Sequence, residues 1–414
     1  MNGMKKTGKN LTDLLDLNRS QIMYYLAKHP GCSRAELGAA TGLTLASITK
    51  TVRSLMECGA IYETGFSEGK KGRRSIGLSF NYDKYKILAI RVSWSQLEMQ
   101  PYDFLGNAYG ELIIVPFGNI TANNIEHVVE AAAAGIHSFC QQFPEIAAIG
   151  LAIPGPCYRD SGSLMLPPYH LDPDKRYYYP LKEKIAAYTQ LPIFVEHDVD
   201  AGALAYWWFE SPNKEDSVIM NIIADDGVGI GLVDKGKVFT GTSNCCCEMG
   251  HISIDYNGRT CPSCGGTGCI NAYCSTRALE QIAGEYLPRH PESLLRSYPD
   301  LSYPNIFEAA KQQDPFASRL VFDCGVHLGQ GVLSLLHIFN PDVIIISGAI
   351  TLAGDLLMNG IQDTFSKNKS CYSVIPKIKL LPNNIRLTLL GAATIAIDRM
   401  LKAPTKYLSL STNN

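Results

Sequence analysis

Residues 33–56 read SRAELGAATGLTLASITKTVRSLM, and this stretch decides the fold of the N-terminal part of the chain. Ser33 and Glu36 have the spacing of a capping box, which starts a helix. Gly42 then allows a tight turn, and Thr44 can cap the helix that follows. Two short helices joined by a glycine turn are typical of a helix-turn-helix.

The second of these helices, over about residues 45–58, has one apolar and one polar face. Its apolar positions recur at helical spacing and are Ile48, Val52, Leu55 and Met56. The opposite face carries the small or basic residues Ala46, Ser47, Lys50, Arg53 and Ser54. Side chains of these kinds suit insertion into a DNA major groove. An earlier helix, with Ile22, Tyr25 and Leu26 on one face, completes the predicted bundle.

Beyond Gly59, residues 61–66 alternate in polarity, and residues 76–80 can form a second strand. The tip between these strands carries four cations, namely Lys70, Lys71, Arg73 and Arg74. A hairpin wing of this kind can contact phosphates or reach a minor groove. The alternative interpretation is a helical bundle with a solvated basic loop. The combination of features favours a double-stranded DNA interface formed by Thr44, Ala46, Ser47, Lys50, Arg53 and the four wing cations.

Charge is unevenly distributed along the 414 residues. Residues 1–80 hold 12 Lys and Arg against 6 Asp and Glu, whereas the remainder holds 25 against 33. A basic head on an acidic body indicates an anionic partner for the head alone. The basic N-terminus is followed by no apolar signal segment, and apolar runs such as Val343–Ile346 are far too short to span a membrane. We therefore expect a cytoplasmic protein of two or three domains.

Strands and helices alternate from Tyr85 onward, which is typical of an α/β fold. The predicted strands are Ile87–Val92, Ala147–Ile153, Ile193–Val195, Val218–Ile223 and Val343–Ile346. Helical patterns lie between them, for example over Asn124–Phe143 and Ala317–Phe339.

A series of short motifs follows the same order as in a known family. The motifs are the Gly72-Arg73-Arg74 wing, GLAIPGP at 150–156, EHDVDA at 196–201, DGVGIG at 226–231, EMGH at 248–251, CGGTGC at 264–269 and NPDVIIISG at 340–348. In order and spacing the chain resembles the ROK (Repressor, ORF, Kinase) family, and its repressors in particular. The resemblance implies a winged helix-turn-helix over residues 1–80. A two-lobed actin-like, sugar-kinase-like fold follows, with lobes 81–198 and 199–414 and a zinc-binding insertion in the second.

A cysteine cluster near a histidine indicates a metal site in a chain without a secretory signal. His251, Cys261, Cys264 and Cys269 supply one nitrogen and three sulfurs, the donor set of a closed structural zinc site. The resemblance places zinc at these residues, although the family begins this motif with Cys-x-Cys and this chain has Cys-Pro-Ser-Cys. The alternative is a set of free thiols beside a core histidine. The nearby triplet Cys245–Cys247 is interpreted as small apolar packing residues.

Sugar kinases of the family need a catalytic base and a glycine-rich phosphate loop. The resemblance places the base at Asp198, but residues 91–96 read RVSWSQ where the kinases have Asp-x-Gly-Gly-Thr-Lys. Arg91 replaces the acid, Ser93 and Trp94 replace glycines that would let the backbone approach phosphate, and Trp94 would occlude the site. Because phosphoryl transfer depends on positioning and electrostatics, we predict that the chain is not an enzyme and that Asp198 is vestigial.

The resemblance also implies a pocket for a sugar-like effector. Asp198, Glu248 and His251 match the family's sugar contacts, whereas His197 and Asn271 replace an Asn and a Glu. Tyr169 stands near the position of another sugar-binding Asn. These exchanges alter the pattern of donors and acceptors, so the effector need not be a common hexose. The alternative is a vestigial pocket. His251 would couple the two sites, with one imidazole nitrogen on zinc and the other toward the pocket.

The predicted function is a sequence-specific DNA-binding transcriptional repressor of carbohydrate-related genes, controlled by a sugar-like effector. We expect a homodimer or homotetramer on a two-fold operator. Two alternatives remain at this point: a sugar kinase with a regulatory DNA-binding head, and a constitutive DNA-binding protein with a dead pocket.

Overall fold

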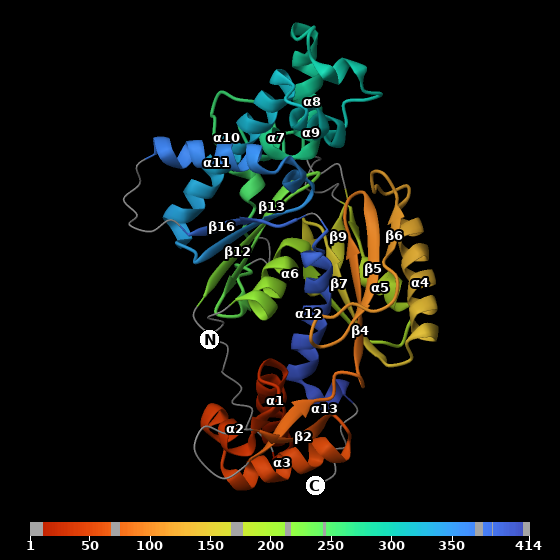
Figure 1. Cartoon of the computed structure of the whole chain (residues 1–414). Helices are drawn as coiled ribbons and strands as arrows, with labels where there is room; N and C mark the ends of the chain where they lie inside the picture. The colour runs from red at the N-terminus through yellow and green to blue at the C-terminus, as the bar shows by residue number, and fades with distance from the viewer. Residues whose placement is uncertain are drawn as a thin grey trace, which may run out of the picture.

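The structure is a computed structural model that describes residues 11–67, 75–166, 177–211, 217–242, 246–368, 376–382 and 384–408. It has a small N-terminal head below a larger two-lobed body (Figure 1). The wing cations Lys70, Lys71, Arg73 and Arg74, together with Tyr169 and Cys245, lie outside the described residues.

The head consists of α1 (Leu11–Lys28), β1 (Cys32–Ser33), α2 (Arg34–Thr41), α3 (Leu45–Glu57), β2 (Ile61–Ser67) and β3 (Ser75–Phe80). Its strands pair in the order β1-β3-β2, all antiparallel, which confirms the predicted hairpin. The capping box forms as expected, because the Ser33 hydroxyl accepts the Glu36 amide and the Glu36 carboxylate accepts the Ser33 amide. Gly42 ends α2 at a φ of 69°, the left-handed conformation that glycine adopts without strain.

The N-terminal lobe is built on a five-stranded sheet in the order β11-β7-β4-β5-β6. Its elements are β4 (Lys86–Val92), β5 (Gln96–Tyr102), β6 (Ile113–Pro116), α4 (Ile125–Gln142), β7 (Ile146–Ile153), α5 (Leu181–Ala186) and β11 (Ile193–His197). Three short strands, β8 (Cys157–Tyr158), β9 (Ser163–Met165) and β10 (Tyr178–Tyr179), form a separate small sheet. Strands β4, β7 and β11 run parallel, and the carboxyl end of β11 leads to His197 and Asp198 of the predicted effector site.

The C-terminal lobe has a second five-stranded sheet, in the order β14-β13-β12-β15-β16. Its strands are β12 (Val218–Ala224), β13 (Val228–Asp234), β14 (Lys237–Val238), β15 (Val343–Ser347) and β16 (Lys377–Leu380). Its helices are α6 (Asp198–Ala205), the π-helix η2 (Tyr206–Glu210), α7 (Asn271–Cys274), α8 (Thr276–Tyr286), α9 (Tyr303–Lys311), α10 (Pro315–Phe339) and α11 (Asp355–Lys367). The short 3-10 turns are η3 (Met249–His251), η4 (Leu287–Arg289), η5 (Leu294–Ser297) and η6 (Ala349–Ala353).

The final helices, α12 (Leu387–Lys402) and α13 (Pro404–Tyr407), leave the C-terminal lobe. Helix α12 packs against α6 and against β4 and β7 of the N-terminal lobe, then descends to α1 in the head (Figure 1). Glycines allow this close approach, since a Cβ at Gly150 would lie 1.8 Å from the carbonyl oxygen of Ala392. The chain therefore returns to the N-terminal lobe at its end, and the boundaries 1–80, 81–198 and 199–414 stay a prediction.

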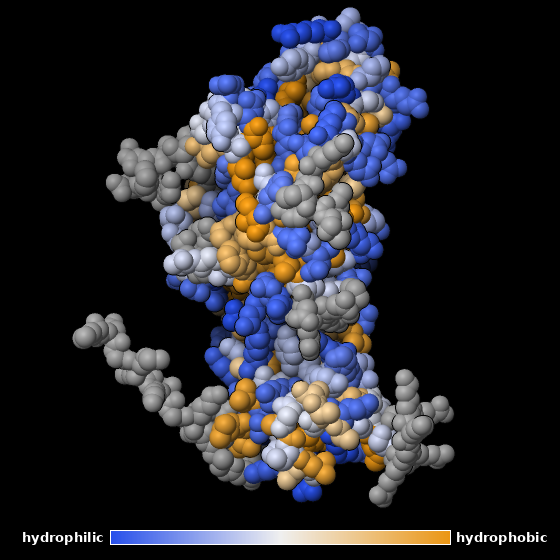
Figure 2. Space-filling view, turned by 90° about the vertical axis from the view of Figure 1, so that its left-hand side faces the viewer, coloured by the Kyte–Doolittle hydropathy of each residue, from blue (hydrophilic) through white to orange (hydrophobic). Residues whose placement is uncertain are grey.

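Helix α10 is long and apolar enough, by length and composition, to cross a membrane. It packs along α9 and α11 within the C-terminal lobe, and residues such as Leu328 and Val332 are fully buried. These contacts make it a core helix of the lobe. Figure 2 shows apolar side chains gathered over the middle of one face of the molecule and again over the head.

Candidate DNA interface, metal centre and effector site

Helix α3 has the two faces that its sequence predicted. Ile48, Val52 and Leu55 are fully buried in the core of the head. The opposite face exposes Ala46, Lys50 and Arg53 to solvent. Two cations about one turn apart on an exposed face can contact adjacent phosphates or base edges.

Two hydroxyls on α3 have structural roles. Thr44 caps the helix, because its hydroxyl accepts the backbone amide of Ser47 at 3.2 Å. Ser54, which the sequence pattern assigned to the polar face, instead accepts a hydrogen bond from Arg19 of α1 at 2.7 Å. That assignment was wrong because Ser54 lies at the border of the two faces, where α1 packs. The chain offers no local signal for a contact 35 residues away.

The four predicted metal ligands converge. The ligand atoms of His251, Cys261, Cys264 and Cys269 all lie within 4.8 Å of one another. The Cys264 and Cys269 sulfurs are 3.7 Å apart, and the Cys261 sulfur lies 3.9 Å from Nδ1 of His251. Tetrahedral zinc with sulfur ligands at about 2.3 Å requires sulfurs about 3.8 Å apart. The donor set and its spacing therefore fit one metal ion.

Glycines shape the loop that carries these thiols. Gly265 and Gly268 have φ angles of 75° and 74°, which side-chain-bearing residues rarely adopt. The amide of Gly266 points at the Cys264 sulfur at 3.4 Å. A backbone amide directed at sulfur stabilises a thiolate, the form that binds metal.

Asn271 joins the metal loop to the loop after β12. Its side-chain oxygen accepts the Val228 amide at 2.9 Å, and its side-chain nitrogen donates to Ser263, between two of the cysteines, at 2.8 Å. Asn271 is buried and engaged on both sides. Its place in the structure is thus that of a connector between the two loops.

The other predicted effector residues gather where β11 ends and α6 begins. His197 Nε2 lies 3.4 Å from Asp198 Oδ1, which also accepts the Val199 amide at 2.8 Å. Burial lowers the pKa of His197 to about 4, so its imidazole is neutral. Burial raises the pKa of Asp198 to about 6 despite the attraction of Arg91.

Glu248 brings the metal loop to this cluster. Glu248 directly precedes η3, and its negative charge partly offsets the lowering of the His197 pKa that burial causes. His251 directs Nδ1 toward the Cys261 sulfur, so Nε2 is the nitrogen left for the predicted pocket contact, which stays a prediction. Beneath the cluster, Arg159 forms ion pairs with the buried carboxylates of Glu196 and Asp200.

The Arg91 side chain crosses between the two lobes, from the stretch 91–96 that the resemblance aligns with the phosphate loop of the kinases. From β4 it pairs with Glu98 at 3.2 Å and with Asp225, at the end of β12, at 3.1 Å. Asp225 also accepts the amide of Ala349, and Arg386 pairs with Glu98. Trp94, expected to occlude this site, packs instead against the core of the N-terminal lobe. The group that spans the lobes is Arg91.

The cysteine triplet is partly described. The Cys246 thiol donates to the carbonyl of Phe239 at 3.0 Å, and Cys247 packs against the core of the C-terminal lobe. These contacts agree with the predicted packing role.

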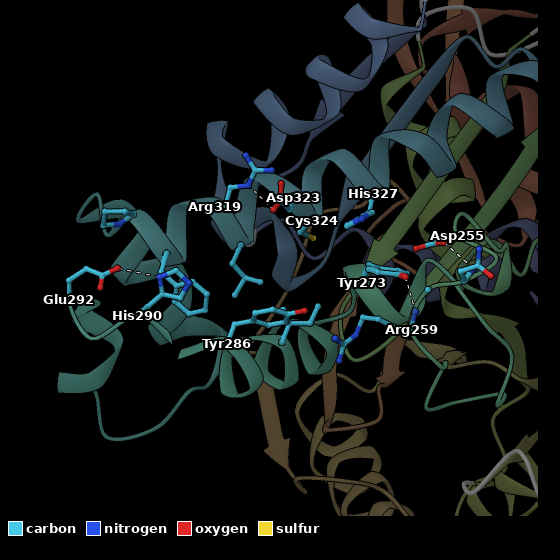
Figure 3. A pocket seen from close by; sticks show the side chains of 16 residues that line it. Asp255, Arg259, Tyr273, Tyr286, His290, Glu292, Arg319, Asp323, Cys324 and His327 are labelled. Carbon is cyan, nitrogen blue, oxygen red and sulfur yellow. Dashed lines mark hydrogen bonds and ion pairs between the residues drawn. The ribbon is translucent and has the colours of Figure 1, made fainter. Parts of the chain in front are cut away.

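A cavity of about 910 Å³ lies elsewhere in the C-terminal lobe, and sequence analysis did not anticipate it. Figure 3 shows it between α8 and α10, with Tyr273 and Arg259 at one end and His290 at the other. It includes none of His197, Asp198, Glu248 or Asn271. Its residues are spread over 73 positions without a recognisable motif, so only the fold assembles them.

Known proteins combine the same head and two-lobed body in one chain. The sequence profile described as the ROK family matches residues 116–399, and a winged helix-turn-helix DNA-binding profile matches residues 15–62. The chain is 27% identical to the xylose repressor of Bacillus subtilis over 393 residues, covering 93% of this chain and 96% of the relative. It is 28% identical to the DNA-binding transcriptional dual regulator NagC of Escherichia coli K12 over 355 residues, covering 85% of each.

Solved structures share the fold. A ROK family transcriptional regulator, homologous to the E. coli MLC protein, superposes with a TM-score of 0.77 at 24% identity, covering 96% of this chain and 99% of that one. A ROK family glucokinase from Streptomyces griseus, in complex with glucose and AMPPNP, gives a TM-score of 0.65 at 23% identity. That match covers 74% of this chain and 98% of the glucokinase.

Proposed function

The chain belongs to the ROK family, and we propose that it is a sequence-specific DNA-binding transcriptional repressor of carbohydrate-related genes. One observation carries the proposal. A winged-helix head with an outward α3 is joined to two lobes that the Arg91–Asp225 ion pair bridges, and Arg91 begins the stretch expected to replace the phosphate loop of the kinases. The curated relatives of similar length are named repressors or regulators, in line with a protein that binds DNA and is not a kinase.

Lys50 and Arg53 are the proposed groove contacts of α3, with Ala46 and Ser47 allowing close approach and Thr44 fixing the start of the helix. The wing cations Lys70, Lys71, Arg73 and Arg74 would add phosphate or minor-groove contacts. We further propose that the protein acts as a homodimer or homotetramer in the cytoplasm, on an operator with two-fold symmetry.

Zinc is the metal that the four-ligand cluster fits best. Three thiolates and one imidazole leave no open position, so the ion would be structural. When bound, zinc would fix the loop that carries His251 and, through Ser263, the position of Asn271.

The effector would be a small sugar held by Asp198, Glu248, His197 and His251, with Asn271 positioning the neighbouring loop. The Asp198 carboxylate can accept a hydroxyl hydrogen bond, and neutral His197 can donate or accept one. Xylose and N-acetylglucosamine appear in the names of the relatives, and both present vicinal polar groups suited to such a cluster.

The test combines DNA and sugar. A duplex is selected by the protein from a random-sequence pool, and its affinity is measured by fluorescence anisotropy with D-xylose, N-acetyl-D-glucosamine or D-glucose added. We expect tight binding to the selected duplex, weak binding to scrambled duplex, and an affinity change with at least one sugar. No preference for the selected duplex would refute the repressor proposal.

Two further measurements address the alternatives. A coupled ATPase assay with the same sugars should show no turnover above background, and turnover abolished by Asp198→Asn would favour the sugar kinase. In thermal-shift screening, at least one of the sugars should raise the melting temperature of the protein. A flat screen together with tight DNA binding would favour a constitutive DNA-binding protein.

A further inference from the structure

Lys28, at the end of α1, is held by aromatic rings of the body. Its Nζ lies 4.0 Å from the ring centroid of Trp207 and 4.8 Å from that of Trp208. The Tyr24 ring of α1 is 4.5 Å away and meets Trp208 edge-on at 5.1 Å. An ammonium near several aromatic faces is attracted by each of them, most strongly where water is excluded. We call this contact the Lys28 joint.

The rings of the joint continue the helix that begins at the proposed effector site. Helix α6 starts at Asp198 and runs without a break into the π-helix η2, which carries both tryptophans. At 1.5 Å per residue, the nine to ten residues from Asp198 to the tryptophans span roughly 14 Å along the axis. Both tryptophans are buried, and single turns of π-helix occur often at functional sites. A shift at Asp198 therefore reaches the joint through one rigid element.

Within the head, α1 connects the joint to α3. Arg19 is buried, and its guanidinium donates to Ser54 of α3 at 2.7 Å and to Thr405 of α13 at 3.0 Å. Asp16 accepts the Thr405 amide at 3.1 Å. One guanidinium thus joins the DNA-reading helix to the end of the body.

We propose that α6–η2 transmits effector occupancy at Asp198 to the head, and that Lys28 and Arg19 are positioning residues for α3. The inference rests on the proposed function. Effector binding at Asp198, at one end of the helix, changes the position of the Trp207 and Trp208 rings at the other end. That shift changes the surroundings of Lys28 and the orientation of α1. Arg19 then carries that change to α3 through Ser54. Coupling of this kind requires the sugar to bind one pose of the joint better than the other.

The first test separates coupling from stability. Lys28→Met keeps the aliphatic stem and removes the charge, whereas Lys28→Arg keeps a cation for the rings. Lys86→Met is the control, because it removes a cation 4.6 Å from the Tyr109 ring, together with its ion pair to Glu145, in the N-terminal lobe away from the joint. Each variant is titrated with the selected duplex in the presence and absence of D-xylose and of N-acetyl-D-glucosamine.

Coupling between two sites is usually roughly 5- to 150-fold in affinity. In Lys28→Met the sugar-induced change in duplex affinity should fall below about twofold, with sugar affinity in the absence of DNA nearly unchanged. Lys28→Arg and Lys86→Met should keep most of the wild-type change. A wild-type response in Lys28→Met would overturn the inference while leaving the proposed function intact.

A second readout needs no sugar. Two of the three tryptophans lie in the joint, so a Trp94→Phe variant reports on Trp207 and Trp208 alone. Because coupling is reciprocal, binding of the selected duplex should change this fluorescence, and Arg19→Ala should abolish the change. Unchanged fluorescence on duplex binding would overturn the inference. A protein that binds no duplex would refute the proposed function, and the inference with it.

Discussion

The ion pair between Arg91 and Asp225 should hold the two lobes together, and a double-mutant cycle can measure its contribution. Its atoms are 3.1 Å apart, and the side chains are 13% and 30% exposed. A charge-assisted hydrogen bond in such partly buried surroundings contributes about 1.5–3 kcal/mol. We therefore expect a coupling energy of about 2 kcal/mol between Arg91→Ala and Asp225→Asn.

The two single substitutions should lower the free energy of unfolding by different amounts. Arg91→Ala also removes one partner of Glu98, whose side chain is 1% exposed, although Arg386 still pairs with that carboxylate. The loss should be about 3–4 kcal/mol, close to the range for a broken buried ion pair. Asp225→Asn keeps an oxygen that can accept the Ala349 amide, so it should cost about 2 kcal/mol.

The assay is equilibrium urea unfolding of the wild type, both single variants and the double variant, followed by far-ultraviolet circular dichroism. The free energies of unfolding are compared on the condition that m, the slope of that free energy against urea concentration, is the same for all four proteins. The control is Arg319 with Asp323, an exposed pair one turn apart on α10, which should couple by less than about 0.5 kcal/mol. If the coupling of Arg91 and Asp225 is as small as that of the control pair, our account of the lobe interface is wrong.

Three further predictions concern the proposed sites. Replacing Lys50 and Arg53 with Ala should weaken binding of the selected duplex and reduce the slope of log affinity against log salt by about 2, and an unchanged gel shift would contradict the α3 assignment. Purified protein should contain about one zinc per chain, and Cys264→Ser should lower both the zinc content by elemental analysis and the melting temperature. The pKa of Asp198, raised by burial to about 6, means that its carboxylate is lost as pH falls through that value. Calorimetric sugar affinity should therefore drop below pH 6 and be flat above pH 7, and a constant affinity would argue against Asp198 as a ligand.

Local patterns predicted the elements well, because caps and periodicity act over a few residues. Ser33 and Glu36 form the capping box, and the five strands predicted in the body are all present within a residue or two of their expected ends. The convergence of the four candidate ligands was also predictable in part, since a short loop keeps Cys261, Cys264 and Cys269 close to each other.

The features that the sequence did not predict depend on contacts between distant parts of the chain. Arg91 and Asp225 are 134 residues apart, and Arg19 and Thr405 are 386 apart. No periodicity links such positions, so the resemblance could set Arg91 where the kinases have an acid but could not tell which carboxylate it meets. Asn271 likewise stood at a sugar-contact position by resemblance, whereas its two hydrogen bonds join loops.

The docking of the head on α12 and α13 has a consequence for the order of biosynthesis. The head is translated before the rest of the described chain, and domains generally fold as they emerge from the ribosome. The part of α13 on which it packs, where Thr405 meets Asp16 and Arg19, is translated 386 residues after Arg19. A nascent chain can therefore carry a folded head while the ribosome still holds the residues that orient it. The head can therefore take its docked orientation only after α13 has been synthesised.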